Sequence, residues 1–169
     1  MYPSARFIYL HRDPRENISS IIEAWEQGEK NGKFITFRNL PDWPMPHWCL
    51  LLPRGWRNMK GRSLAEIAGF QWQSCNDAIL NELEKISSKK WTTISHQELT
   101  SNTKATVTQL SNFIGNHIDE HFDEYISHEL PLSSTTITAP KKDKWMRHKN
   151  EIEALLPGLQ KTTDRINAL

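Results

Sequence analysis

Residues 6–20 read RFIYLHRDPRENISS, and this stretch decides the fold class. Its first part, Arg6 to His11, is a short apolar run of β-forming residues between two prolines, as is typical of a buried strand in a parallel sheet. Asp13, Pro14 and Glu16 then mark a helix start, with an N-cap, a proline at the first helical position and a capping-box partner. Apolar residues follow at helical spacing: Ile18, Ile21, Ile22 and Trp25. A strand that leads directly into a helix predicts an α/β protein.

The same strand-then-helix order returns later in the chain. The predicted elements are a helix over Ser63 to Ser87, a strand over Lys90 to Ser95, a helix over Thr103 to Gly115, a Ser/Thr-rich connector over Ser127 to Pro140, and two terminal helices over Lys144 to Leu156 and Leu159 to Leu169. Pro157 and Gly158 separate the two terminal helices, because proline interrupts the helical hydrogen bonds.

The segment from Gly28 to Gly61 differs from the rest in composition. It carries four prolines and three tryptophans, namely Pro41, Pro44, Pro46, Pro53, Trp43, Trp48 and Trp56. The prolines exclude a regular helix, so the segment is predicted to be a long packed loop. Two interpretations stay open, a substrate-facing loop whose tryptophans line an acceptor cleft and an irregular cover of the core.

Composition limits the function classes. The chain has 169 residues, enough for one domain with a sizeable core, and 21 Lys and Arg against 20 Asp and Glu give a net charge of +1. This balance argues against a protein that coats nucleic acid by bulk charge, so any anion site must be local. We find no apolar run long enough to span a membrane, no signal sequence and only two cysteines, which together predict a cytoplasmic protein.

The turn after the first strand is the best candidate for chemistry. Arg12 follows the strand's carboxyl end, where open α/β sheets bind ligands, and the amides at the start of the next helix are expected to point the same way. Arg12 can bind phosphate oxygens in a fork, and Ser20, eight residues on, can donate a hydroxyl hydrogen bond. The alternative is structural, since an Arg-Asp-Pro turn also fixes a strand-to-helix corner by a salt bridge.

Three segments in order resemble one family. YLHRDPRENISS resembles the 3′-phosphate-binding motif of sulfotransferases that use 3′-phosphoadenosine-5′-phosphosulfate (PAPS). FQWQSCNDAILNEL and WTTISHQELTSNTKATVTQLSNFIG are similar to that family's long helix and to its following strand and helix, and LPLSSTTITAPKKDKWMRHKNEIEALLPGL resembles the C-terminal segment of bacterial members. The resemblance covers essentially the whole chain, residues 1–169, as a single partial sulfotransferase domain. It implies a three-layer α/β fold with a parallel sheet, related to nucleotide kinases.

The resemblance also implies where PAPS binds. Arg12 and Ser20 would hold the 3′-phosphate, and His96 stands where relatives carry a tyrosine that meets the adenine. The basic loop before the last helices would correspond to Lys141, Lys142 and Lys144. A charge run of that kind is also typical of a solvated surface, and this second interpretation stays open. No residue set calls for a metal.

Some features of the family are missing from this sequence, and their absence leads to further expectations. None of the seven glycines forms a Gly-rich phosphate loop, so the chain resembles the C-terminal portion of a sulfotransferase, and its catalytic base and phosphosulfate loop are not identified here. We expect sulfuryl transfer from PAPS to a hydroxyl or amine of a small-molecule or carbohydrate acceptor in the complete enzyme. The isolated chain is expected to be inactive, and self-association or a separate N-terminal segment is expected to complete it. The alternatives are a non-catalytic nucleotide- or partner-binding remnant and a kinase-like enzyme, the latter disfavoured because a Walker-type loop is also missing.

Two other residue sets could carry chemistry. His117, Glu120 and His121 spell H-x-x-E-H, the inverted zinc-hydrolase arrangement, but their acidic surroundings favour an exposed helix or turn. Cys49 and Cys75 lie among apolar neighbours, which favours core positions over nucleophiles.

Overall fold

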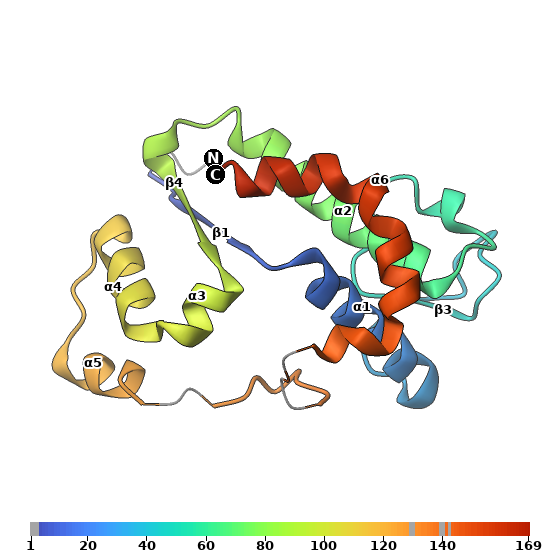
Figure 1. The fold of residues 1–169 in the computed structure, drawn as a ribbon, viewed down its shortest axis with the longest axis horizontal. Coiled ribbons are helices and arrows are strands. Elements are labelled where there is room, and N and C mark those ends of the chain that lie inside the picture. The colour runs from blue at the N-terminus through green and yellow to red at the C-terminus, as the bar shows by residue number, and fades with distance from the viewer. Residues whose placement is uncertain (1–3, 129–130, 139–140, 142) are drawn as a thin grey trace. The chain divides into compact units, whose positions relative to one another are not determined.

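The computed structural model describes residues 4–128, 131–138, 141 and 143–169 (Figure 1). The chain divides into two compact units. The first unit comprises residues 1–12 and 81–136, and the second comprises residues 13–80 and 137–169. Helix α2 (Leu64–Leu83) passes from the second unit into the first.

The first unit is built on a pair of parallel strands. Strand β1 (Phe7–His11) pairs with β4 (Trp91–Ser95), in a register that runs from Phe7 opposite Trp91 to His11 opposite Ser95. Both strands confirm the sequence prediction, and parallel pairing was the expected form. The helical elements of this unit are η2 (Ser88–Lys90), α3 (His96–Ser101), α4 (Thr103–Ile114) and α5 (Glu120–Ile126).

Strand β1 is less buried than its apolar sequence predicts. Tyr9 is buried, whereas Phe7, Ile8 and Leu10 are exposed. The reason is the small size of the sheet, since β4 is the one strand paired with β1 among the described residues. The prediction of a fully buried strand is therefore wrong for most of β1.

The second unit begins with the helix that the sequence predicted. Helix α1 (Pro14–Asn31) follows Asp13, whose side chain accepts hydrogen bonds from the backbone N–H groups of Arg15 and Glu16. It ends at Gly32, which has a φ of 78°, a left-handed conformation that glycine adopts without strain. Its inward face carries Ile18, Ile22 and Trp25, all buried.

The segment 28–61 is more regular than a loop. Strand β2 (Ile35–Arg38) pairs antiparallel with β3 (His47–Cys49), and the 3-10 helix η1 (Trp56–Met59) follows. The strands have four and three residues, too short for the alternation that marks a strand in sequence. Four non-glycine residues here have positive φ values: Phe34, Asn39, Asp42 and Leu50.

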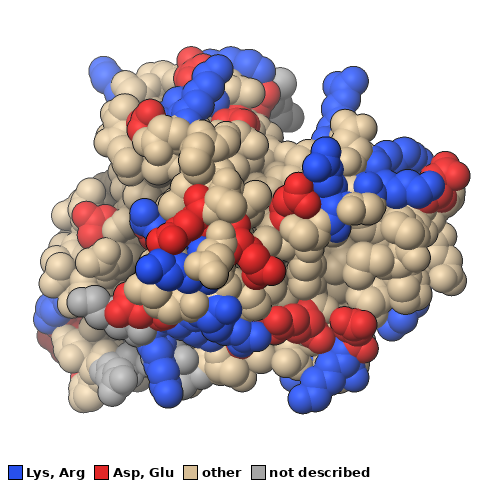
Figure 2. All heavy atoms as spheres, turned by 45° about the vertical axis from the view of Figure 1, so that its right-hand side comes forward, with Lys and Arg blue, Asp and Glu red and all other residues tan. Residues whose placement is uncertain are grey.

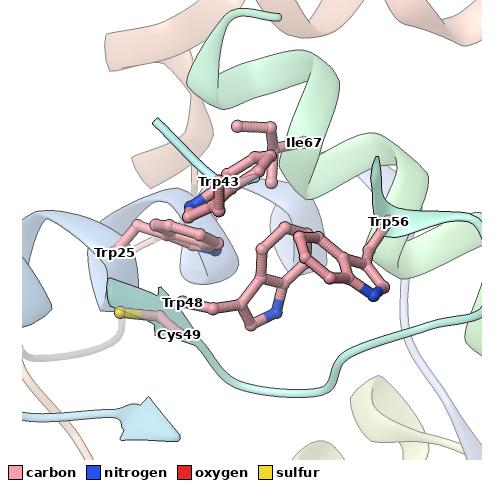
Figure 3. Packing of buried hydrophobic residues seen from close by; sticks show 6 residues of the cluster. All are labelled: Trp25, Trp43, Trp48, Cys49, Trp56 and Ile67. Atoms are coloured by element: carbon pink, nitrogen blue, oxygen red, sulfur yellow. The ribbon is translucent and has the colours of Figure 1, made fainter. Parts of the chain in front are cut away.

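The tryptophans of this segment form the core of the second unit, as Figure 3 shows. Trp48 packs edge-on against the Trp25, Trp43 and Trp56 rings, with centroids 4.9 to 5.8 Å apart. Such edge-to-face pairs are favourable beyond the area that they bury. Helices α1 and α2, strand β3 and η1 all contribute to this cluster, which explains why a proline-rich segment is well ordered.

The C-terminal helix is continuous where two helices were predicted. Helix α6 (Lys149–Asn167) includes Pro157, and Figure 1 shows that it changes direction part-way along. Contacts on the C-terminal side hold it in place, since Gln73 Nε2 donates to Gly158 O at 3.2 Å and Thr162 Oγ1 donates to Asp77 Oδ1 at 2.9 Å. Packing thus preserves the helix although it contains a proline.

The described residues form two two-stranded sheets, so a three-layer arrangement around one larger parallel sheet is not shown. Within the described ranges, none of the helices has the combined length and apolar character that crossing a membrane requires.

Candidate functional site

The parallel pairing of β1 and β4 brings two of the predicted site residues to one sheet edge. His11 and Ser95 are register partners at the carboxyl ends of the two strands. Arg12 follows the first and His96 follows the second. In open α/β sheets, ligands bind beyond the carboxyl ends of the strands. The structure therefore places Arg12 and His96 where the sequence predicted a ligand, within the first unit.

A capping box organises this edge, and it adds two residues that sequence reasoning missed. The Ser95 N–H donates to Glu98 Oε2 at 2.9 Å, and the Glu98 N–H donates to Ser95 Oγ at 3.0 Å. The Ser95 hydroxyl also donates to Glu98 Oε2 at 2.8 Å, and the hydrogen bonds that the carboxylate accepts from the Ser95 N–H and hydroxyl, together with the charge of His11, hold the pKa of Glu98 below its ordinary value. Burial lowers the pKa of His11, although the Glu98 carboxylate opposes the shift. The S-x-x-E spacing was the sequence signal for this cap.

The start of α1 is not open to an anion. Asp13 Oδ1 accepts from the Arg15 N–H at 2.9 Å and from the Glu16 N–H at 3.3 Å, and its Oδ2 lies 3.4 Å from Arg15 NH1. The expectation that these helical amides face a ligand is therefore wrong, because the cap already uses them. A phosphate at this turn would have to be held by side chains.

Ser20 lies on α1 in the second unit and is half-buried. Its hydroxyl donates to the Glu16 carbonyl oxygen at 3.0 Å. Donation to a phosphate would require the hydroxyl to turn away from that carbonyl.

Lys144, a predicted phosphate ligand, is bound to a carboxylate on α1. Its Nζ lies 2.5 Å from Glu23 Oε2, and Thr138 Oγ1 donates to Glu23 Oε1 at 2.8 Å. Burial alone would raise the pKa of Glu23, but the hydrogen bonds from Lys144 and Thr138 and the positive charges of Lys144 and Arg147 hold it below its ordinary value. Glu23 was not singled out from the sequence, because its partners lie more than one hundred residues away.

A second carboxylate, one turn further along α1, also binds a side chain from the segment that contains Lys144. Glu26 Oε2 accepts from Arg147 NH2 at 2.7 Å, and Arg15 at the start of α1 stacks on the Trp145 ring at 5.5 Å. Of the other lysines predicted to bind phosphate, Lys141 is exposed and Lys142 lies outside the described residues.

The predicted site residues thus belong to both units. Arg12 and His96 share an edge in the first unit, while Ser20 lies on α1 of the second unit and Lys144 binds that same helix.

The other two candidate residue sets, the H-x-x-E-H motif and the two cysteines, lack the surroundings that metal binding or nucleophilic chemistry would need. Among the described residues, no group of three or more His, Cys, Asp and Glu side chains is arranged to hold a metal ion. His117, Glu120 and His121 are among the residues to which this applies. Burial raises the pKa of Cys49 to about 11 and also raises that of Cys75, so both thiols are protonated at neutral pH.

The tryptophans of the 28–61 segment do not line a cleft. Trp43, Trp48 and Trp56 are buried in the core, and the indole N–H groups of Trp43 and Trp48 donate to the carbonyl oxygens of His47 and Leu51. Of the two interpretations of this segment, the structure supports the cover of the core.

The sequence matches no known family model and no curated protein. Among solved structures, the chain is similar to a sulfotransferase domain from the curacin biosynthetic pathway, with a TM-score of 0.51 and 14% identity. The chain has a sulfotransferase-like fold. The match covers 90% of this chain and 55% of that domain, so the chain spans about half of the domain's length.

Proposed function

We propose that this chain supplies the 3′-phosphate and adenine side of a PAPS-dependent sulfotransferase, which transfers a sulfuryl group to a hydroxyl or amine acceptor. One observation carries the proposal. The register of β1 and β4 brings Arg12 and His96 to the carboxyl edge of a parallel strand pair, in a fold similar to a sulfotransferase domain.

The residues at this edge fit the nucleotide end of PAPS. The Arg12 guanidinium would bind 3′-phosphate oxygens in a fork, because its planar donors match that geometry. His96 would stack on the adenine or hydrogen-bond to it. Since Asp13 uses the first amides of α1, further donors to the phosphate would have to be side chains, and Ser20 and Lys141, which lie in the second unit, stay predictions from the sequence.

PAPS, when bound, supplies an activated sulfuryl group. The contribution of this chain is to bind and orient the nucleotide that leaves, which is a positioning and charge-stabilising role. We assign no catalytic base within the described residues.

The test compares two nucleotides that differ in one group. We expect the chain to bind 3′-phosphoadenosine 5′-phosphate (PAP) more tightly than adenosine 5′-phosphate by calorimetric titration, because PAP alone carries the 3′-phosphate. A charge-assisted contact to that group is worth about 1.5 to 3 kcal/mol. Equal affinity for the two nucleotides, or no binding of PAP, would contradict the proposal.

The second candidate function is a nucleotide-binding protein without transfer activity. It is favoured by the absence of any Gly-rich phosphate loop among the seven glycines of the sequence. Both candidates require PAP binding, and both agree with an isolated chain that transfers nothing, so a transfer assay with PAPS discriminates between them only if transfer is measured. We expect no transfer by the isolated chain, and measurable transfer would exclude this second candidate.

A further inference from the structure

The segment from Pro53 to Ser63, called here the 53–63 surface, combines four cations with no acidic residue. Arg54, Arg57, Lys60 and Arg62 lie on it, and the sequence has no Asp or Glu between Asp42 and Glu66. The rest of the sequence has 17 Lys and Arg against 20 Asp and Glu, and Figure 2 shows Lys and Arg interspersed with Asp and Glu on the face that it draws. A nearly neutral chain therefore carries a concentrated local positive charge.

The four cations are exposed, and three of them are not neutralised. Arg62 pairs with Glu66 at 3.2 Å. Arg54, Arg57 and Lys60 form no ion pair within 4.0 Å of a described carboxylate. Cations without partners attract a multivalent anion strongly, because they lose no existing ion pair when they bind it.

The backbone holds these cations at regular intervals. Consecutive turns are closed by N–H groups that donate to carbonyl oxygens three residues earlier: Trp56 to Pro53, Asn58 to Gly55, Lys60 to Arg57, and Arg62 to Met59. Arg57 lies within η1, and Lys60 follows directly after its last residue as the C-cap.

Two further contacts make the surface rigid. Trp56 is buried in the tryptophan core, which anchors η1, and the Arg57 guanidinium lies over the Trp56 ring at 4.4 Å. Holding a cation in place before binding lowers the entropy that is lost when a ligand binds.

From these observations we infer that the 53–63 surface binds an acidic polysaccharide, a polymer with repeated sulfate or carboxylate groups. Arg54, Arg57 and Lys60 follow one another at intervals of three residues and can meet repeated anions, and the two guanidinium groups can bind such anions in a fork. A single-stranded nucleic acid fits less well, because it needs exposed aromatic rings for base stacking. The aromatic side chains between Asp42 and Glu66 are Trp43, Trp48 and Trp56, and all three are buried.

The inference goes beyond the proposed function, and it is tested without nucleotide. The full chain is titrated with heparin as the sulfated polysaccharide, with neutral dextran and single-stranded DNA as comparisons, at about 50 to 200 mM salt. We expect heparin to bind more tightly than either comparison polymer, with an affinity that falls as salt rises, because counterions are released on binding.

Two triple variants with the same net charge distinguish attraction of heparin by the 53–63 surface from attraction by the net charge of the whole chain. The variant Arg54→Gln, Arg57→Gln and Lys60→Gln should bind heparin about tenfold or more weakly, with a salt dependence reduced by about three ions. The control variant Lys85→Gln, Lys149→Gln and Lys161→Gln should bind like the wild type. Arg57→Lys keeps the charge but loses the fork and the contact with the Trp56 ring, so it should bind heparin more weakly than the wild type and more tightly than the first triple variant. Matching thermal unfolding curves would show that all variants fold.

Three results would overturn the inference. These are heparin binding no tighter than dextran binding, equal losses in the two triple variants, and tighter binding of single-stranded DNA that the first triple variant abolishes. The last result would assign the surface to nucleic acid. A failure here leaves PAP binding untouched, so it is distinguishable from a failure of the proposed function.

Discussion

At the scale of single residues, Arg12 is the side chain whose role is easiest to isolate. It follows the register partner of Ser95 at the end of β1, and its neighbour Asp13 is committed to capping α1. We expect Arg12→Ala to weaken PAP binding by about 1.5 to 3 kcal/mol and to leave adenosine 5′-phosphate binding unchanged, because the second nucleotide has no 3′-phosphate. Calorimetric titration of both nucleotides measures this.

Arg15→Ala is the matched control for that experiment. Its guanidinium already pairs with Asp13 at 3.4 Å and stacks on Trp145, so its loss should not discriminate between the two nucleotides. Equal losses for both nucleotides in the Arg12→Ala variant would remove Arg12 from the phosphate site.

Glu23 is the residue whose charge matters most to the stability of the second unit. Its side chain is 7% exposed and binds Lys144, whereas that of Glu26, on the same helix, is 37% exposed and binds Arg147. Removing one member of a buried pair leaves the other charge without compensation. We expect Glu23→Gln to lower the free energy of unfolding by about 3 kcal/mol and Glu26→Gln by less than about 1 kcal/mol, as measured by urea unfolding.

The contribution of the Glu23 charge to the stability of the fold should decrease as the pH falls. Its pKa is lowered in the folded state, so the charged pair stabilises the fold fully above the ordinary pKa of about 4.5. This contribution is lost as the pH falls through the folded pKa, because protonation removes the charge. The stability difference between wild type and Glu23→Gln should therefore shrink below about pH 4. A difference that stays constant from neutral to acid pH would show that the charge contributes nothing.

At the scale of elements, the packing of α1 against β3 depends on one glycine. A Cβ added at Gly28 would lie 2.3 Å from Cys49 Sγ, and Cys49 is fully buried beside Trp48. We expect Gly28→Ala to lower the free energy of unfolding by about 1 to 2 kcal/mol, since overpacking outweighs the gain in helix propensity. Adding Cys49→Ala should recover part of that loss, because it removes the clashing atom.

Gly158 in α6, unlike Gly28, has room for a larger side chain. A Cβ there would meet no described atom within 4 Å, so Gly158→Ala should be neutral or stabilising by up to about 1 kcal/mol. Thermal unfolding of the two alanine variants compares them directly. A Gly28→Ala variant as stable as Gly158→Ala would refute the close packing of α1 on β3.

The elements that the sequence predicted well are those fixed by local signals. Asp13 marks the start of α1 through capping chemistry, and Gly115 ends α4 with a φ of 77°. The loop boundary predicted at Gly28 was wrong, since α1 continues to Asn31. The β2–β3 pair was missed because its strands are too short to show a period. The break predicted at Pro157 was wrong, since the contacts of Gln73 and other α2 residues preserve the helix.

In the candidate site too, residues that follow a local sequence signal were predicted, and contacts between distant residues were not. Arg12 and His96 were placed correctly at a strand end because each directly follows a local strand signal. The pairing of Lys144 with Glu23 joins residues far apart in sequence, and no local pattern encodes a contact of that kind. The resemblance therefore pointed to Lys144 as a phosphate ligand, and its pairing with Glu23 was not predicted.

At the scale of the whole molecule, the β1 strand predicts how copies of the chain associate. Phe7, Ile8 and Leu10 are 45%, 44% and 49% exposed, and among the described residues β1 has a strand on one side alone. An exposed apolar edge of a parallel pair is a template for further strand pairing. We expect the chain to form dimers or larger species, which light scattering should detect as a mass that rises with concentration.

A charge on that strand tests whether β1 causes the association. Leu10→Lys should restore the monomer mass, because a lysine on an edge strand opposes pairing with a second chain. Leu51→Lys replaces another exposed leucine, in the second unit, and should leave the association unchanged. If the wild-type chain stays monomeric at high concentration, or if both variants dissociate it equally, then the apolar edge of β1 is not what brings the copies together.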